Sequence, residues 1–139
     1  MLGLREAPRL LNRLRWIEVA AWNRPGELKL YLGSTAASDN VKHPSQKSRV
    51  VRAETLDQIV AENHLLRVDW VKVDVEDSEV EVLEGMENAM LQMKPRVIVE
   101  VWSENRQALL KIAKRVDYGA VQISPPMGSA ACYWLLLPT

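Results

Sequence analysis

Residues 68–86 read VDWVKVDVEDSEVEVLEGM, and this stretch decides the fold. Its first half is rich in Val and Trp, as in a buried strand, and ends in acidic residues. Its second half has apolar residues at helical spacing, so a strand passes almost directly into a helix. Ligands of open α/β sheets bind beyond the carboxyl ends of the strands. Asp74 and Glu76 stand at that position and are the first candidates for chemistry.

The segments before this stretch predict strands, a loop and a helix. Strand patterns occur at residues 16–21, 27–32 and 49–54. Residues 33–48 are rich in Ser, Ala, Asn, Lys and Pro and lack periodicity, which predicts a loop acting as a lid or a link. His43 lies in this loop, and we expect it to be solvated. A helix over 56–63 follows, with Thr55 as its N-cap.

The segments after it continue the alternation. A helix over 78–93 has Ser78 and Glu81 at capping-box spacing. A second helix is predicted over 104–115. Strands are predicted at 96–102, 119–124 and 132–137. The last two strands read as an antiparallel hairpin, and the whole pattern predicts one α/β domain over residues 1–139 with a mostly parallel sheet and helices on its faces.

Composition narrows the function classes. A chain of 139 residues is one domain by length, and no stretch approaches the roughly 18 apolar residues of a membrane span. The formal net charge of zero argues against a nucleic-acid binder driven by bulk charge. The single Cys132 fits a reducing cytoplasm. We read the basic residues of a short helix at 8–14 as a solvated face, and His43 and His64 show no metal-ligand spacing with the acids.

Several spaced elements together resemble the core signature of the FkbM-type S-adenosylmethionine-dependent methyltransferases. In that family a T-L-D precedes a K-I-D-V-E-G-A-E turn, a V-L-x-G helix and a P-x-I-x-x-E strand. The matching elements here are Thr55-Leu56-Asp57, Lys72-Val73-Asp74-Val75-Glu76, Val82-Leu83-Glu84-Gly85 and Pro95-Arg96-Val97-Ile98-Val99-Glu100. The resemblance implies a Rossmann-like class I methyltransferase fold, in which the final antiparallel strand lies between its neighbours.

Two departures accompany this resemblance. Asp77-Ser78 replaces the family's Gly-Ala, and we expect Asp77 to remove the backbone freedom of the glycine. The glycine-rich cofactor turn has no counterpart before Trp16. The chain therefore resembles a truncated fold, incomplete at its N-terminus. A truncated gene product, a fragment from a misplaced start codon and a domain with a changed role all remain open.

The resemblance also implies roles for particular residues. The cofactor would be S-adenosylmethionine and the acceptor a hydroxyl of a sugar or another small metabolite. Asp74 and Glu76 would be catalytic, because alternate strand residues point to one face. The adenine would lie at Ala20, Ala21 and Trp22, and the substrate would contact Lys72 and Glu100. On the residues alone, a structural Lys72–Asp74 pair and an acidic cluster favouring the helix dipole are equally open.

A second function class fits the same sequence. A relative that has lost two central strands exposes sheet edges, and exposed edges recruit partners. The chain would then be an inactive oligomerising or binding module, with a homodimer formed edge to edge.

Overall fold

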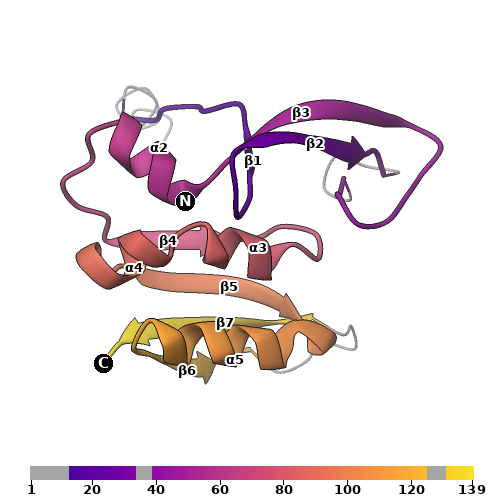
Figure 1. Ribbon diagram of the computed structural model, residues 1–139. Coiled ribbons are helices and arrows are strands. Elements are labelled where there is room, and N and C mark those ends of the chain that lie inside the picture. The colour runs from indigo at the N-terminus through magenta and orange to yellow at the C-terminus, as the bar shows by residue number, and fades with distance from the viewer. Residues whose placement is uncertain (1–12, 34–38, 125–130) are drawn as a thin grey trace, which may run out of the picture.

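The computed structural model describes residues 13–33, 39–124 and 131–139, and these form a mixed α/β structure with two sheets (Figure 1). One sheet has three strands in the order β1-β3-β2, and the other has four in the order β4-β5-β7-β6. The α/β class is confirmed. The single, mostly parallel sheet is not confirmed, because only β1–β3 and β4–β5 pair in parallel, whereas β2–β3, β5–β7 and β6–β7 are antiparallel.

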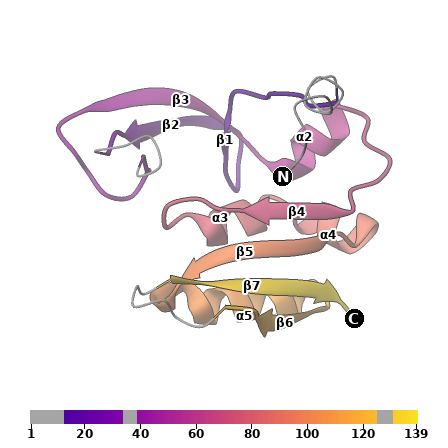
Figure 2. The same ribbon diagram turned by 180° about the vertical axis from the view of Figure 1, so that it is seen from behind.

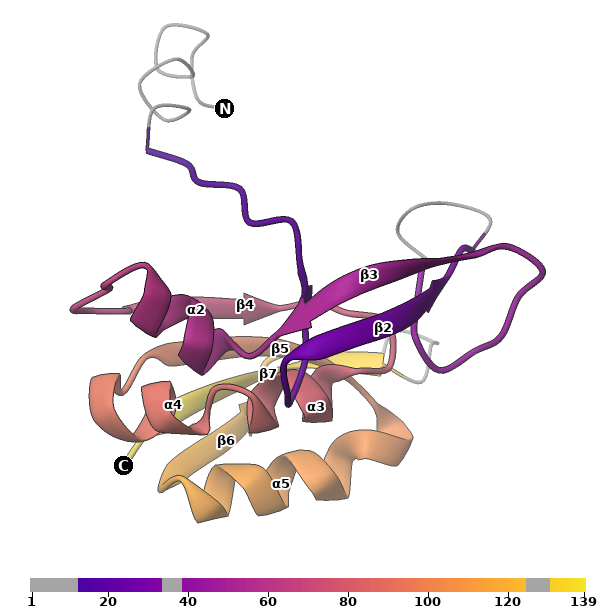
Figure 3. The same ribbon diagram turned by 45° about the horizontal axis from the view of Figure 1, so that its top comes forward.

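The three-stranded sheet contains β1 (Ala20–Ala21), β2 (Gly26–Tyr31) and β3 (Ser48–Glu54). The last two agree with the predicted strands to within a residue or so. The strand predicted over 16–21 shrinks to its last two residues, because only Ala20 and Ala21 pair with β3. The preceding residues run away from the body of the protein (Figure 3), and the side chain of Trp16 is 92% exposed.

The four-stranded sheet contains β4 (Trp70–Val73), β5 (Arg96–Trp102), β6 (Tyr118–Gln122) and β7 (Ala131–Pro138). The final strand, β7, lies between β5 and β6 and is antiparallel to both, as the resemblance implied.

Three helices cover one face of the four-stranded sheet (Figure 1). They are α3 (Glu79–Glu84), α4 (Glu87–Met93) and α5 (Arg106–Arg115). Alternate residues of β5, such as Val97 and Val99, are buried against these helices. Seen from behind, the strands stand in front of the helices (Figure 2). Asp74, which follows β4, is exposed. No helix within the described segments has the length and apolar character needed to cross a membrane.

The predicted helix over 78–93 is two helices, because the chain breaks at Gly85 and Met86. The capping box was wrong: Ser78 precedes α3 but its side chain makes no cap bond, and Glu81 pairs with Lys42 instead. Lys94 closes α4 in a left-handed conformation with φ of 52°.

The predicted helices over 56–63 and 104–115 are confirmed. Thr55 caps α2 (Leu56–Glu62), where its hydroxyl accepts from the Gln58 backbone N–H at 3.0 Å. The helix predicted over 104–115 is α5, preceded by the short 3-10 helix η2 (Ser103–Asn105). The predicted helix at 8–14 and the link at 125–129 lie largely or wholly outside the described residues.

Candidate functional site

A cleft of about 840 Å³ lies between the three-stranded sheet and the turn that follows β4. Its size is within the range of small-molecule sites, roughly 300–1,000 Å³. Asp74 and Glu76 line it on one side, and Ala20, Ala21 and Trp22 line it on another. The structure therefore brings together the five residues that the sequence placed at the catalytic and adenine positions.

The remaining walls come from elements distant in the sequence. The strands β2 and β3 supply apolar side chains, including Leu28, Leu30 and Val51, and two arginines, Arg49 and Arg52. The connection between β2 and β3 contributes residues 39–41, so part of the predicted loop over 33–48 forms a wall of the cleft.

Lys72 and Glu100 lie outside the cleft lining, but both contact Asp74. Lys72 forms an ion pair with Asp74 in which both side chains are exposed, so the expected pairing is confirmed and the pair is not buried. The hydrogen bond from Lys72 lowers the pKa of Asp74 below its usual range. Burial and the neighbouring Asp74 raise the pKa of Glu100. Asp74 therefore stays ionised, and Glu100 is the carboxyl group that retains a proton more readily.

Tyr133 belongs to this group, although no sequence pattern pointed to it. It is paired directly with Glu100 in the β5–β7 register and interacts with Asp74. The charges of Asp74 and Glu100 raise the pKa of its hydroxyl, so the phenol stays protonated. Only the pairing of β7 with β5 brings it there, and that pairing joins residues about thirty positions apart.

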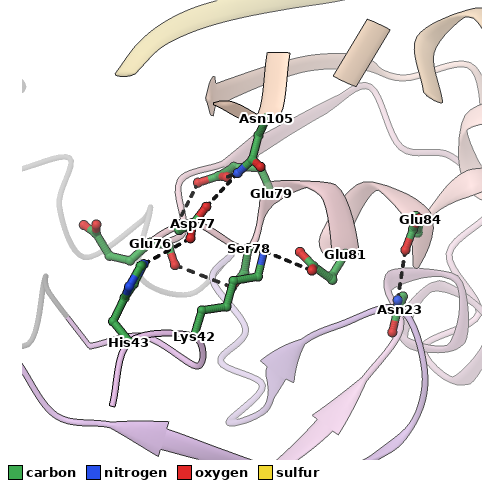
Figure 4. Close-up of polar contacts among 10 residues, drawn as sticks. All are labelled: Asn23, Lys42, His43, Glu76, Asp77, Ser78, Glu79, Glu81, Glu84 and Asn105. Atoms are coloured by element: carbon green, nitrogen blue, oxygen red, sulfur yellow. Dashed lines mark hydrogen bonds and ion pairs between the residues drawn. The ribbon is translucent and has the colours of Figure 1, made fainter. Parts of the chain in front are cut away.

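The cleft wall at Trp22 is held by backbone contacts. The Trp22 N–H donates to the Glu54 carbonyl at 2.9 Å. The end of α3 packs against the same place, since Gly85 lies against the Trp22 carbonyl. Next to it, the Asn23 side chain donates to Glu84 at 2.9 Å (Figure 4).

The turn between β4 and α3 holds a polar network that sequence reasoning missed (Figure 4). The Asn105 amide donates to Asp77 at 2.7 Å and to Glu79 at 3.4 Å. The other Asp77 oxygen lies 3.0 Å from His43 Nε2, so this histidine is paired as well as partly solvated. Asp77 has φ of 61°, so the expectation that it removes the glycine's conformation was wrong; aspartate tolerates this left-handed region better than most residues.

Glu79 is the buried member of this network. Its side chain is almost fully enclosed, with a relative exposure of 1%, and it accepts a hydrogen bond from the Asp77 N–H at 3.1 Å. Burial raises the pKa of Glu79 to about 7. No three or more His, Cys, Asp or Glu side chains of the described residues are grouped as a metal site.

A family model, the methyltransferase FkbM domain, matches residues 17–118, which is well over half of the chain. The chain belongs to the FkbM methyltransferase family. The fold agrees with that of the crystal structure of methyltransferase FkbM from Methylobacillus flagellatus KT, with a TM-score of 0.59 and 15% sequence identity. That match covers 94% of this chain and 31% of the other, so this FkbM-family chain spans about a third of its length. No curated protein matches the sequence.

Proposed function

We propose that this FkbM-family chain takes part in S-adenosylmethionine-dependent O-methylation of a hydroxyl group on a sugar or another small metabolite. The observation that supports the proposal is the shared cleft, in which Asp74 and Glu76 face the wall formed by Ala20, Ala21 and Trp22. An acid-lined wall and an apolar wall in one cleft suit two reactants held side by side.

The residues of the cleft fit the proposed cofactor. Ala20 and Ala21 are small and Trp22 is aromatic, so this wall suits a flat, apolar adenine ring. Glu18 and Asp39 add carboxylates to the lining, which suit hydroxyl groups, an amine and a positive sulfonium. When bound, the cofactor supplies an electrophilic methyl group.

The acid-lined wall supplies the remaining functions. Glu76 is half-buried at the cleft and would accept the proton of the acceptor hydroxyl at a carboxylate oxygen. Asp74, kept ionised by Lys72, would bind a second hydroxyl and orient the acceptor. Glu100 lies outside the lining and holds its proton more readily, so it would donate a hydrogen bond to Asp74 and orient that carboxylate. Such positioning is the main contribution that a protein makes to an in-line displacement.

Calorimetric titration with S-adenosylhomocysteine tests the proposal. We expect micromolar binding, unchanged in Glu27→Gln, an exposed control on β2 outside the cleft lining. Single-turnover methylation of a panel of polyols should fall at least about 100-fold in Glu76→Gln, in line with loss of a general base. If the folded chain shows no heat of binding with S-adenosylhomocysteine, the proposal is overturned for this chain.

The free sheet edges favour a second candidate, a binding or assembly module without activity. Within the described residues β1 pairs only with β3 and β4 only with β5, so each leaves one edge unpaired. Near the β4 edge, Leu66 is 96% exposed and Trp70 is 54% exposed. Unpaired edges with exposed apolar residues favour a homo-oligomer paired edge to edge. Sedimentation equilibrium that gives a monomer at 100 μM would exclude the homo-oligomer. Either function is proposed for a cytoplasmic protein.

A further inference from the structure

We propose that residues 40–43, here called the clasp, form an opening wall of the cleft that is fastened from outside by two surface ion pairs. The proposal goes beyond the proposed function, because the clasp closes the cleft whatever ligand the cleft takes. It concerns how the cleft is entered.

The inner side of the clasp belongs to the cleft. Asn40 and Val41 both line it, together with Glu76. The backbone of Asn40 pairs with Tyr31 at the end of β2, with N–H to carbonyl distances of 3.0 Å and 2.7 Å. It also forms a parallel bridge with Glu76. The clasp therefore joins the three-stranded sheet to the turn after β4, across the cleft.

The outer side of the clasp carries the two ion pairs. Lys42 Nζ lies 3.0 Å from Glu81 Oε1, and His43 Nε2 lies 3.0 Å from Asp77 Oδ2 (Figure 4). The His43 side chain is 67% exposed, so its pair is well solvated. The Lys42 and Glu81 side chains are 31% and 20% exposed, so water reaches this pair as well. Ion pairs that water screens are weak, so these two pairs hold the clasp loosely beside its bridge to Glu76.

The two sides of this closure differ in rigidity. On the protein body, Asp77 is also held by Asn105, and its own N–H is bonded to Glu79. On the clasp, the His43 N–H donates to the Asn40 side chain at 2.6 Å, which keeps the short turn together. Breaking the two outer pairs and the Glu76 bridge would therefore release the clasp as a unit and leave the body unchanged.

Charge explains why the clasp lies where it does. The body presents Asp77 and Glu81 toward it, and the buried Glu79 is hydrogen-bonded to the Asp77 backbone. The clasp presents Lys42 and, when protonated, His43. This complementarity draws the clasp onto the rim, and added salt weakens the attraction.

Amide hydrogen exchange of the unliganded chain tests the clasp without any ligand. In Lys42→Ala/His43→Ala we expect exchange at residues 40–43 to rise by about tenfold, since both pairs are lost. Exchange at residues 40–43 of the wild-type protein should also rise in 0.5 M NaCl. Arg67→Ala removes an exposed ion pair with Asp69 near the opposite end of β4 and serves as the matched control. Unchanged exchange in β5 establishes that each variant is folded.

Two results would overturn the proposal: exchange at 40–43 that is as fast in the wild type as in a free peptide, or exchange that the double substitution leaves unchanged. A second arm uses S-adenosylhomocysteine as the probe. If it binds, the double variant should show faster association and dissociation than Arg67→Ala. If it does not bind, the proposed function fails for this chain, but the exchange data still test whether the clasp opens.

Discussion

The carbonyl oxygen of Trp22 lies so close to Gly85 that a Cβ on residue 85 would stand 2.1 Å from it. Real Cβ atoms do not approach heavy atoms within 3.0 Å, and the obstructing atom is backbone, so no side-chain rotation can relieve the clash. Trp22 lines the cleft. The glycine that ends α3 therefore sets the position of a cleft wall as well as the packing of a helix.

Gly85→Ala should move this wall and destabilise the fold. Overpacking of a tight contact costs about 1–3 kcal/mol, and we expect a loss of that order in urea unfolding, together with weaker binding of S-adenosylhomocysteine. Gly119→Ala is the control, because its Cβ would meet nothing closer than 3.9 Å. Equal stability of the two variants would show that the Trp22 backbone can move away from residue 85 at no cost in free energy.

Asp57 lies in α2 and its side chain caps α4, so its substitution should destabilise α4. Its carboxylate accepts from the backbone N–H of Ala89 at 2.8 Å and of Asn88 at 3.1 Å, and so caps the start of α4. Asp57→Ala should cost about 1–2 kcal/mol in the free energy of unfolding, whereas Asp57→Asn should retain most of it, because both residues are good caps. An alanine variant as stable as the asparagine variant would contradict the capping role.

The sequence predicted the parts of this fold that depend on local pattern. The alternation in residues 27–32 and the apolar run at 96–102 gave strands in the right places. The rule for strand ends placed Asp74 and Glu76 at the cleft. The strand predicted at 16–21 fell short, since a strand needs a partner that periodicity does not reveal.

The parts that sequence reasoning missed depend on contacts between distant residues. The T-L-D motif was recognised by resemblance, but the cap that Asp57 provides spans 31 or 32 residues. The partners of Asp77 lie 28 and 34 residues away, in Asn105 and His43. Each pair is one of many that a sequence permits, and only the tertiary fold selects it. Pattern analysis therefore found the catalytic candidates but not the network behind them.

The left-handed backbone of Asp77 has a free-energy cost, and a comparison of two substitutions at this position can measure it. Its φ of 61° is favourable for glycine and costs other residues about 1–2 kcal/mol. Asp77→Gly and Asp77→Ala both lose the contacts to His43 and Asn105, so these contacts cancel in the comparison. We expect the glycine variant to be more stable by about 1 kcal/mol, after allowance for its more flexible unfolded chain.

Chemical denaturation of both Asp77 variants at pH 7 measures this difference. An alanine variant equal to or more stable than the glycine variant would show that the turn relaxes out of the left-handed region. A glycine variant that is more stable by the full difference would show that the left-handed backbone of residue 77 carries this cost.

Glu79 should make the stability of the protein depend on pH around neutrality. Burial raises its pKa from an ordinary 4.5 to about 7, so the folded state prefers the protonated acid. The stabilisation is complete below about pH 4.5 and is lost as the pH rises to about 7, because over this range the carboxyl group ionises in the unfolded chain while the folded state still holds its proton. At 1.36 kcal/mol for each pKa unit, the full change is up to about 3 kcal/mol.

Glu79→Gln keeps the shape of the side chain and removes its titration. The free energy of unfolding should therefore fall more steeply from pH 5 to pH 8 in the wild type than in Glu79→Gln, and Glu27→Gln, on exposed β2, should follow the wild type. Comparing the two pH curves removes the contribution of every titrating group that the variants share. Parallel pH curves for wild type and Glu79→Gln would mean that Asn105 and the Asp77 N–H stabilise the ionised carboxylate enough to offset its burial.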